Sequence, residues 1–329
     1  MKYQVKCDGM ILKPAIFHDG HREYRIGTGE ERGSMKVYEV FPGIEFIYHD
    51  FTMQKRSCSL DTGEELLEIS YCQEGRAECR WVCGDSLYLG KGDLCITRTE
   101  KEEPPLGFPA GYYRGISVLL DLKRLQQEPL PLLDRETLGL DYMADKFCPD
   151  HHFFAMRANA HIAHIFTELY EYSAGPETGH EVPEKFWEDF RKIKVLELLL
   201  YLGMVNPSAE RRIMRITKNQ IDVIKAVRER ICKDLSEELT IEQLAREYCI
   251  SPTALKANFR AVYNTSVKEY LRKARMERAA ELLRSDGMTV GEIARQVGYA
   301  NQSKFASAFR SLYGISPVEY RKKCSHGEE

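Results

Sequence analysis

An internal repeat in the last third of the chain constrains its fold more than any other feature. Residues 240–246 (TIEQLAR) line up with residues 289–295 (TVGEIAR). With one residue inserted in the second copy, the similarity continues further on, where Leu255, Phe259-Arg260, Tyr263, Ser266 and Glu269-Tyr270 match Phe305, Phe309-Arg310, Tyr313, Ser316 and Glu319-Tyr320. Matches in this number and order predict two copies of one structural unit.

Each copy carries the signals that start short helices. Thr240 with Gln243, and Thr289 with Glu292, have the spacing of a capping box, in which two side chains accept hydrogen bonds from backbone N–H groups at a helix start. The second and third helices have N-cap residues of their own, which are Ser251 and Ser266 in the first copy and Asn301 and Ser316 in the second. Only a short turn separates the first two helices, so each copy is predicted to be a helix-turn-helix.

The second helix of each copy is predicted to expose a face without acidic residues. At 100° per residue, the inward positions are Leu255, Phe259 and Val262 in the first copy and Phe305, Phe309 and Leu312 in the second. The opposite faces carry Thr253, Ala257 and Arg260 in the first copy, with Lys256 flanking, and Ser303, Ser307 and Arg310 in the second, with Gln302 flanking. Hydroxyl, amide and basic side chains of this kind suit the negatively charged major groove of DNA.

The charge of the chain divides with the repeat. All 329 residues together carry a net charge of -3, but residues 211–329 hold 23 basic and 15 acidic residues, a net of +8. Residues 1–210 hold 24 basic and 35 acidic residues, a net of -11. A basic half beside an acidic half indicates a nucleic-acid partner for the basic half.

The sequence pattern of the first half predicts β-strands followed by two helices. Short β-prone runs cover residues 44–51, 66–72, 77–83 and 86–89, with turn signals at Gln73-Glu74-Gly75 and at residues 90–93. Helical periodicity follows at residues 158–173 and 184–205, the latter with Phe186, Phe190, Ile193 and Leu200 on one side. The chain is therefore predicted to be α+β, with an N-terminal β-sandwich or barrel and an all-α C-terminal domain.

The repeat, the bridging helix at residues 267–284 and the segment IARQVGYANQSKFASAFRSLYGISPVEYRK resemble the DNA-binding domain of the AraC/XylS transcription regulators over about residues 217–323. The resemblance implies that the second helices enter successive major-groove segments about 34 Å apart. It assigns base contacts to Thr253, Lys256, Ala257, Gln302, Ser303, Ala306 and Ser307, and phosphate contacts to Arg260 and Arg310. Because Ala257 stands where many relatives have a long polar side chain, the first helix is expected to read fewer bases directly.

The N-terminal β-rich segment resembles the cupin-like sensor of the same family, on LEISYCQEG and the turn GKGDL. This resemblance implies a small-molecule effector. The apolar stripes at residues 158–205 predict a homodimer formed through that segment. Activation of transcription would also need contact with RNA polymerase, although no motif in the sequence marks such a surface. An apolar ligand pocket is predicted from the aromatic residues of the strands, which are Tyr48, Phe51, Tyr71, Trp81 and Tyr88. The segment YANQSKFASAFR is similar to the corresponding segment in regulators of the pyochelin type, which sense an iron-loaded siderophore.

Three alternatives remain open from the residues. Cys72, Cys79, Cys83 and Cys95 suggest metal or redox sensing, or a repair transferase using Cys72 or Cys83, although they lack a C-x-x-C pair. His161, His164 and Glu168 share a helical stripe that could bind a metal, but a cupin oxidase would need histidines clustered on strands, where only His49 is found. A regulator controlled by a partner protein, without a small ligand, is the third.

We therefore expect a non-enzymatic transcription regulator that binds double-stranded DNA, with no cofactor and no metal. The expected domains are a cupin-like sensor at residues 1–125, a helical linker and dimerisation region at 126–210, and the DNA-binding domain at 211–329. The start MKYQVKCDGM lacks the pattern of a secretory signal, and no apolar run reaches 18 residues. A cytoplasmic protein with reduced cysteines and no membrane partner is expected.

Overall fold

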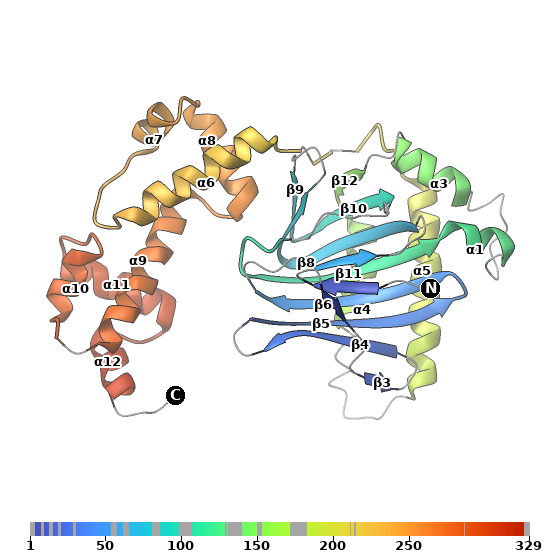
Figure 1. Cartoon of the computed structure of the whole chain (residues 1–329), viewed down its shortest axis with the longest axis horizontal. Coiled ribbons are helices and arrows are strands. Elements are labelled where there is room, and N and C mark those ends of the chain that lie inside the picture. The colour runs from blue at the N-terminus through green and yellow to red at the C-terminus, as the bar shows by residue number, and fades with distance from the viewer. Residues whose placement is uncertain are drawn as a thin grey trace. The chain divides into compact units, whose positions relative to one another are not determined.

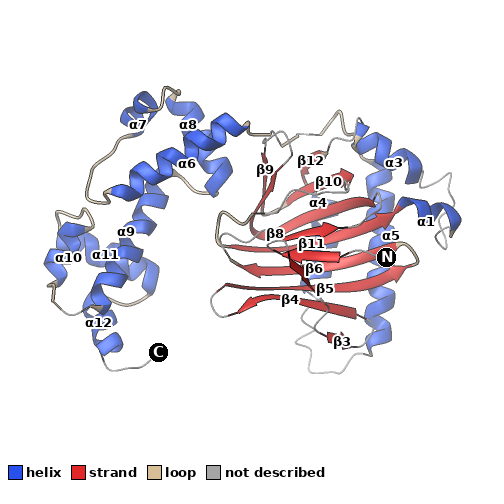
Figure 2. Cartoon of the chain, viewed as in Figure 1, coloured by secondary structure: helices blue, strands red, loops and turns tan. Residues whose placement is uncertain are grey.

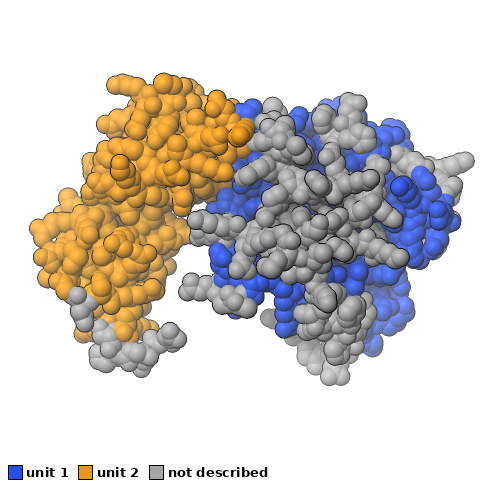
Figure 3. All heavy atoms as spheres, viewed as in Figure 1, with its two compact units in different colours: residues 1–217 blue, residues 218–329 orange. Residues whose placement is uncertain are grey.

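The computed structural model divides into two compact units, Met1–Thr217 and Lys218–Glu329, coloured separately in Figure 3. The structure describes residues 4–7, 10–12, 16–18, 21–28, 31–53, 58–61, 66–80, 86–98, 107–128, 130, 140–149, 153–171, 183–210, 212–213, 215–285 and 287–325. Within these ranges no helix has the length and apolar character needed to span a membrane.

The first unit is built on an antiparallel sheet in the order β12-β10-β8-β11-β6-β5-β4-β3, with β9 paired to β8 (Figures 1 and 2). Its strands are β3 (Ile16–His18), β4 (His21–Thr28), β5 (Glu31–Phe41), β6 (Ile44–Thr52), β8 (Leu66–Arg80), β9 (Ser86–Gly90), β10 (Asp93–Arg98), β11 (Tyr112–Asp121) and β12 (Phe154–Arg157). A small sheet in the order β2-β1-β7 holds β1 (Gln4–Cys7), β2 (Met10–Leu12) and β7 (Cys58–Asp61).

Among the described strands, the main sheet is open rather than a closed barrel. Its edge strands β12 and β3 do not pair with each other. Helices cover one face, so that face is buried without a second half of a barrel. The closed barrel is therefore not confirmed, whereas an antiparallel N-terminal sheet is. The strand β12 lies within residues 126–210, which the sequence predicted as helical, and it pairs with β10.

The described part of this unit has four helices: α1 (Leu122–Gln127), α3 (Leu140–Phe147), α4 (Ala160–Glu171) and α5 (Glu184–Met204). The helices α4 and α5 run across one face of the sheet (Figure 2). Alternate strand residues such as Phe46, Ile69 and Val118 pack there against Phe166 and Leu198, which we call the helix-side core. The opposite residues, among them Ile47, Phe51, Leu87, Leu119 and Ala155, form the far-face core.

The turn predicted at Gln73-Glu74-Gly75 is wrong, because β8 continues through it from Leu66 to Arg80. The turn residues instead mark an irregularity, since the pairing register of β8 and β11 shifts between Arg114 and Gly115. Gly75 has φ +79°, and a Cβ there would collide with the carbonyl oxygen of Tyr112. A glycine therefore serves a bulge here rather than a chain reversal.

The described part of the second unit holds seven helices: the six that the repeat predicts, three in each copy, and α6 before them. They are α6 (Lys218–Lys233), α7 (Ile241–Glu247), α8 (Pro252–Tyr263), α9 (Val267–Arg284), α10 (Val290–Gln296), α11 (Gln302–Tyr313) and α12 (Pro317–Ser325). We call α6, α7 and α8 the first module and α10, α11 and α12 the second module; α9 joins them.

Candidate functional site

Capping residues fix where the helices of both modules begin. Complete capping boxes are present at Thr240 with Gln243, at Ser266 with Glu269 and at Thr289 with Glu292. Thr289 Oγ1, for example, accepts a hydrogen bond from Glu292 N at 3.2 Å, and Glu292 Oε2 accepts one from Thr289 N at 2.7 Å. The predicted helix starts at these positions are therefore confirmed. They could be predicted from the sequence because a capping box involves residues only three positions apart.

The second helices, α8 and α11, are held by buried aromatic and aliphatic side chains. Leu255, Phe259 and Val262 anchor α8, and Phe305 with Phe309 anchors α11. Leu312 was predicted to face inward but is 47% exposed, because the inward face of α11 turns toward Ala308 instead. The remaining inward positions agree with the prediction.

The predicted DNA contacts lie on the opposite faces of these two helices. In α8, the side chains of Thr253, Lys256, Ala257 and Arg260 are exposed. In α11, Gln302, Ser303, Ser307 and Arg310 are exposed and Ala306 is partly buried. Neither helix contains an acidic residue, so each presents hydroxyl, amide and cationic groups alone. Their individual roles in base or phosphate contact stay predictions.

The sequence prediction missed Lys304, which is exposed in the first turn of α11. Lys304 lies 100° around the helix from the buried Phe305, so helical periodicity could have predicted that its side chain is exposed. Lys256, Arg260, Lys304 and Arg310 together give the two helices four cationic side chains.

A repeated tyrosine contact ties the outer helices of the two modules to α9. Arg228 Nε in α6 donates to Tyr270 Oη in α9 at 2.8 Å. In the same way, Arg284 Nη2 in α9 donates to Tyr320 Oη in α12 at 2.9 Å. The internal repeat thus extends beyond the helix-turn-helix itself, and α9 closes the first module while it opens the second.

A chain of polar side chains crosses the far face of the sheet in the first unit. Ser70 Oγ donates to Glu68 Oε1 at 2.6 Å, and Ser70 Oγ lies 3.0 Å from Ser117 Oγ. Ser117 Oγ lies 2.9 Å from His49 Nε2. These residues come from the adjacent strands β8, β11 and β6, where Ser117 pairs directly with Ser70. Sequence reasoning missed this polar chain, because it depends on strand register.

The polar chain lies among apolar and aromatic neighbours. Ser117 is 2% exposed, and burial lowers the pKa of His49 to about 4, so the imidazole is neutral at physiological pH. The His49 ring lies 5.8 Å from that of Phe51, which stacks on Phe108 at 4.9 Å. Hydrogen-bonding groups held in such a core are costly unless they are satisfied, and they often mark a site that recognises a polar ligand.

The residues predicted to line a ligand pocket lie in different parts of the first unit. Tyr48 and Tyr71 pack in the helix-side core, where Tyr48 Oη donates to Leu169 O at 2.7 Å. Phe51 lies in the far-face core, and Tyr88 Oη donates to Glu78 Oε1 at 3.0 Å. Trp81 lies outside the described residues. The structure therefore does not bring the four described side chains to one face, and their role as a pocket stays a prediction.

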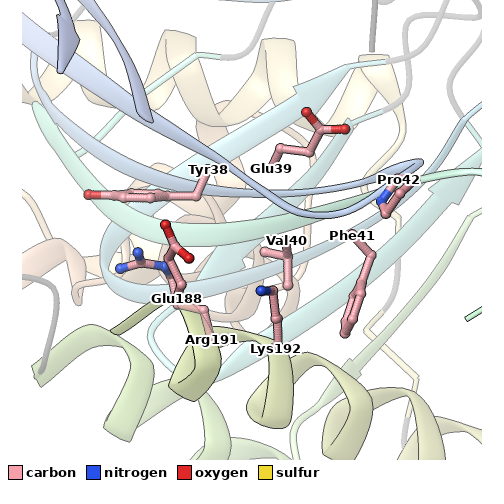
Figure 4. Close-up of a pocket in the computed structure, with 8 residues that line it drawn as sticks. All are labelled: Tyr38, Glu39, Val40, Phe41, Pro42, Glu188, Arg191 and Lys192. Atoms are coloured by element: carbon pink, nitrogen blue, oxygen red, sulfur yellow. The ribbon is translucent and has the colours of Figure 1, made fainter. Parts of the chain in front are cut away.

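A groove of about 280 Å³ lies where the end of β5 approaches α5 (Figure 4). It is lined by Tyr38, Glu39, Val40, Phe41, Pro42, Glu188, Arg191 and Lys192. The guanidinium of Arg191 lies 4.1 Å from the ring centre of Tyr38 and donates to Glu184 Oε1 at 2.5 Å. Its charge is thus already matched within the protein.

The cysteines and histidines singled out by the sequence do not form a metal site in the described ranges. Cys72, Cys79 and Cys95 are free thiols, and Cys83 lies outside the described residues. Burial raises the pKa of Cys72 to about 12, which keeps this thiol protonated and weakly nucleophilic. His164 Nε2 lies 3.6 Å from Glu168 Oε1, while Glu168 Oε2 lies 2.5 Å from Lys194 Nζ.

Comparison with known proteins places the second unit among helix-turn-helix domains. The family described as "Helix-turn-helix domain" matches residues 244–323. The HTH-type transcriptional regulator GadX of Escherichia coli O157:H7 is 32% identical over 128 residues, covering 39% of this chain and 41% of GadX. A putative AraC-like transcription regulator of Streptomyces lividans is 36% identical over 90 residues, covering 27% of this chain and 30% of that protein.

Among solved structures, the C-terminal domain of AraT, a response regulator from Geobacillus stearothermophilus, is 37% identical, with a TM-score of 0.30. That similarity covers 31% of this chain and 84% of the AraT chain. The matched part spans about two fifths of the length of the GadX relatives.

Proposed function

We propose that the chain is a sequence-specific DNA-binding transcription regulator of the AraC/XylS type, because a helix-turn-helix family matches residues 244–323 and the similar relatives are named as HTH-type and AraC-like regulators. One observation supports this proposal more strongly than the others. Two capped helices, α8 and α11, occupy equivalent places in a tandem repeat, and both expose hydroxyl, amide and basic groups with no acidic residue. Such faces fit two segments of a major groove.

The proposed contacts divide by chemistry. Gln302, Ser303 and Ser307 in α11, and Thr253 and Lys256 in α8, read base edges through hydrogen bonds. Ala257 and Ala306 offer only methyl groups, which suit the methyl group of thymine. Arg260 and Arg310 lie toward the ends of their helices and bind phosphates, which orient the protein without reading sequence.

DNA binding is tested with the full chain and a random-sequence duplex library. Duplexes enriched over several rounds are expected to bind far more tightly than scrambled duplexes, and the affinity is expected to fall steeply with added salt. A double variant, Arg260→Glu with Arg310→Glu, should lose binding. Failure of the folded wild-type chain to enrich any duplex at low salt would overturn the proposal.

We also propose that the first unit controls the second through a small-molecule effector bound on the far face of the sheet. The polar chain from Glu68 to His49 supports this, because it places paired donors and acceptors beside the apolar far-face core, with Ser117 buried and the other three residues partly exposed. An effector acts by binding one arrangement of the protein better than another. This activity needs neither catalysis nor a cofactor, and the matched relatives are named as regulators.

The effector proposal is tested by thermal-shift screening of the full chain against sugars, aromatic acids and ferric siderophores. A compound that binds the folded form raises its melting temperature. The Ser117→Val variant should lose the response to that compound, whereas Thr52→Val, an exposed change on β6, should keep it. A response that survives Ser117→Val would show that the effector lies elsewhere.

Dimerisation through α5 is proposed from an apolar stripe that this unit leaves uncovered. Phe186, Ile193, Leu200 and Met204 are 54%, 62%, 41% and 70% exposed, at spacings of seven, seven and four residues. A stripe with this period suits the same stripe on a second copy. Sedimentation should show a dimer that Ile193→Glu dissociates and Lys185→Glu leaves intact; a wild-type monomer would contradict the proposal.

A further inference from the structure

Arg275, in the middle of α9, donates hydrogen bonds to both modules. Its Nε donates to Leu235 O at 2.7 Å and its Nη2 to Glu237 O at 3.3 Å. Both acceptors lie in the connection between α6 and α7, in the first module. Its Nη1 donates to Gly298 O at 3.3 Å, in the turn between α10 and α11 of the second module. One guanidinium therefore links three backbone carbonyls from segments far apart in the chain.

The two helix-turn-helix turns differ at the place where Arg275 binds. Cys249 in the first turn and Gly298 in the second occupy equivalent positions, with φ values of 54° and 83°. The side chain of Cys249 is exposed, so this turn accommodates one. At Gly298 a Cβ would lie 2.7 Å from both Leu235 O and Arg275 Nη2. The second turn is thus the surface on which the first module rests, and a side chain would push them apart.

Only arginine suits this place. A guanidinium is planar, carries five N–H donors in fixed directions and stays charged at every physiological pH. It reaches three acceptors at once and lies 5.8 Å from the ring centre of Tyr299, which follows Gly298. A lysine ammonium is a point charge on a flexible stem, so it would satisfy fewer of these carbonyls and fix their directions poorly.

We propose that Arg275 is a positioning residue that sets the separation and angle of α8 and α11, and so the half-site spacing that the protein selects. This inference rests on the proposed DNA binding. Without the Arg275 bonds, the connection between α6 and α7 and the turn before α11 lose the guanidinium that fixes their carbonyls relative to each other. One base pair of added spacing moves a half-site by about 3.4 Å and turns it by about 34°. Two modules held rigidly bind a duplex with altered spacing weakly, whereas two loosely held modules bind it nearly as well as the native spacing.

The test compares half-site spacings in duplexes that the wild-type chain has enriched from a random library. Duplexes with the native spacing, with one base pair inserted and with one deleted are bound by the wild type, Arg275→Lys, Gly298→Ala and Arg278→Lys. Arg278 is a matched control, because it lies three residues further along α9, is exposed and pairs with Glu281 on the same helix. Affinities come from fluorescence anisotropy, corrected for the active fraction by stoichiometric titration.

The wild type and Arg278→Lys are expected to prefer the native spacing by about tenfold or more, the usual scale for one disturbed position in a site. Arg275→Lys and Gly298→Ala should reduce that preference at least threefold while binding an isolated half-site as the wild type does. A uniform loss of affinity on every duplex, or an unchanged spacing preference, would overturn the inference. Failure of the wild type to bind DNA would instead refute the proposed function.

Discussion

Replacing Arg310 with alanine should weaken binding to every duplex and make binding less sensitive to salt. Arg310 is exposed in the last turn of α11, and Gln302 and Ser307 are exposed earlier on the same helix. A cation that contacts a phosphate releases a condensed counterion from DNA. Its removal therefore changes the slope of log affinity against log salt, not only the affinity.

The size of the effect follows from the exposed cations of α8 and α11 that are not assigned to base edges, which are Arg260, Lys304 and Arg310. If each neutralises one phosphate, they contribute a slope of about -2.7, at about -0.9 per contact. Raising salt from about 50 to 200 mM then costs the wild type about 40-fold in affinity through these contacts. With two contacts left in Arg310→Ala, the slope is about -1.8 and the loss about 12-fold.

Fluorescence anisotropy titrations of the full chain at five salt concentrations measure both slopes. Arg25→Ala is the matched control, because Arg25 is an exposed arginine of the first unit paired with Glu23. It should leave the slope unchanged. If Arg310→Ala altered the preferred sequence but kept the wild-type slope, the assignment of Arg310 to a phosphate would be wrong.

Three further changes probe separate parts of the account. Gln302→Ala should relax preference at one base pair by about 1–3 kcal/mol while non-specific binding stays constant, as library selection would show; loss at every position would contradict base reading. Thr289→Ala should lower the free energy of unfolding by about 1 kcal/mol in urea, because Glu292 N loses its acceptor; an unchanged midpoint would refute the cap. Burial lowers the pKa of His49 in the folded chain to about 4, from an ordinary value of 6.5. Between these two pH values the unfolded chain binds more protons than the folded chain. The free energy of unfolding therefore falls as the pH falls, by up to about 1.4 kcal/mol per pH unit. His49→Gln should remove that slope in urea unfolding from pH 6.5 to 4.5, and an equally steep profile would exclude His49 as its source.

The helical half of this protein could be predicted well from its sequence because its signals are local. A capping box such as Thr289 with Glu292 spans three residues, and the helix it starts buries the neighbouring Ile293 and Ala294. The exposed positions on α8 and α11 follow from the same periodicity. Leu312 was misplaced because an apolar residue at the end of a helix need not meet a neighbour, and 47% of its surface stays exposed.

The sheet was less predictable because strand pairing joins distant residues. The Gln73-Glu74-Gly75 signal is the same for a chain reversal and for a bulge, and only the pairing of β8 with β11 distinguishes them. The contact between His49 and Ser117 joins positions 68 residues apart. The hydrogen bond from Arg275 to Leu235 likewise spans 40 residues, so no local sequence pattern predicts it.

A hydroxyl-radical footprint of the full chain on a duplex enriched from a random library shows whether both α8 and α11 enter the major groove. We predict two protected segments on one face of the duplex, with centres about one helical turn apart, one segment for each helix. Protection of a single segment, or no protection under conditions where the chain is folded, would contradict it.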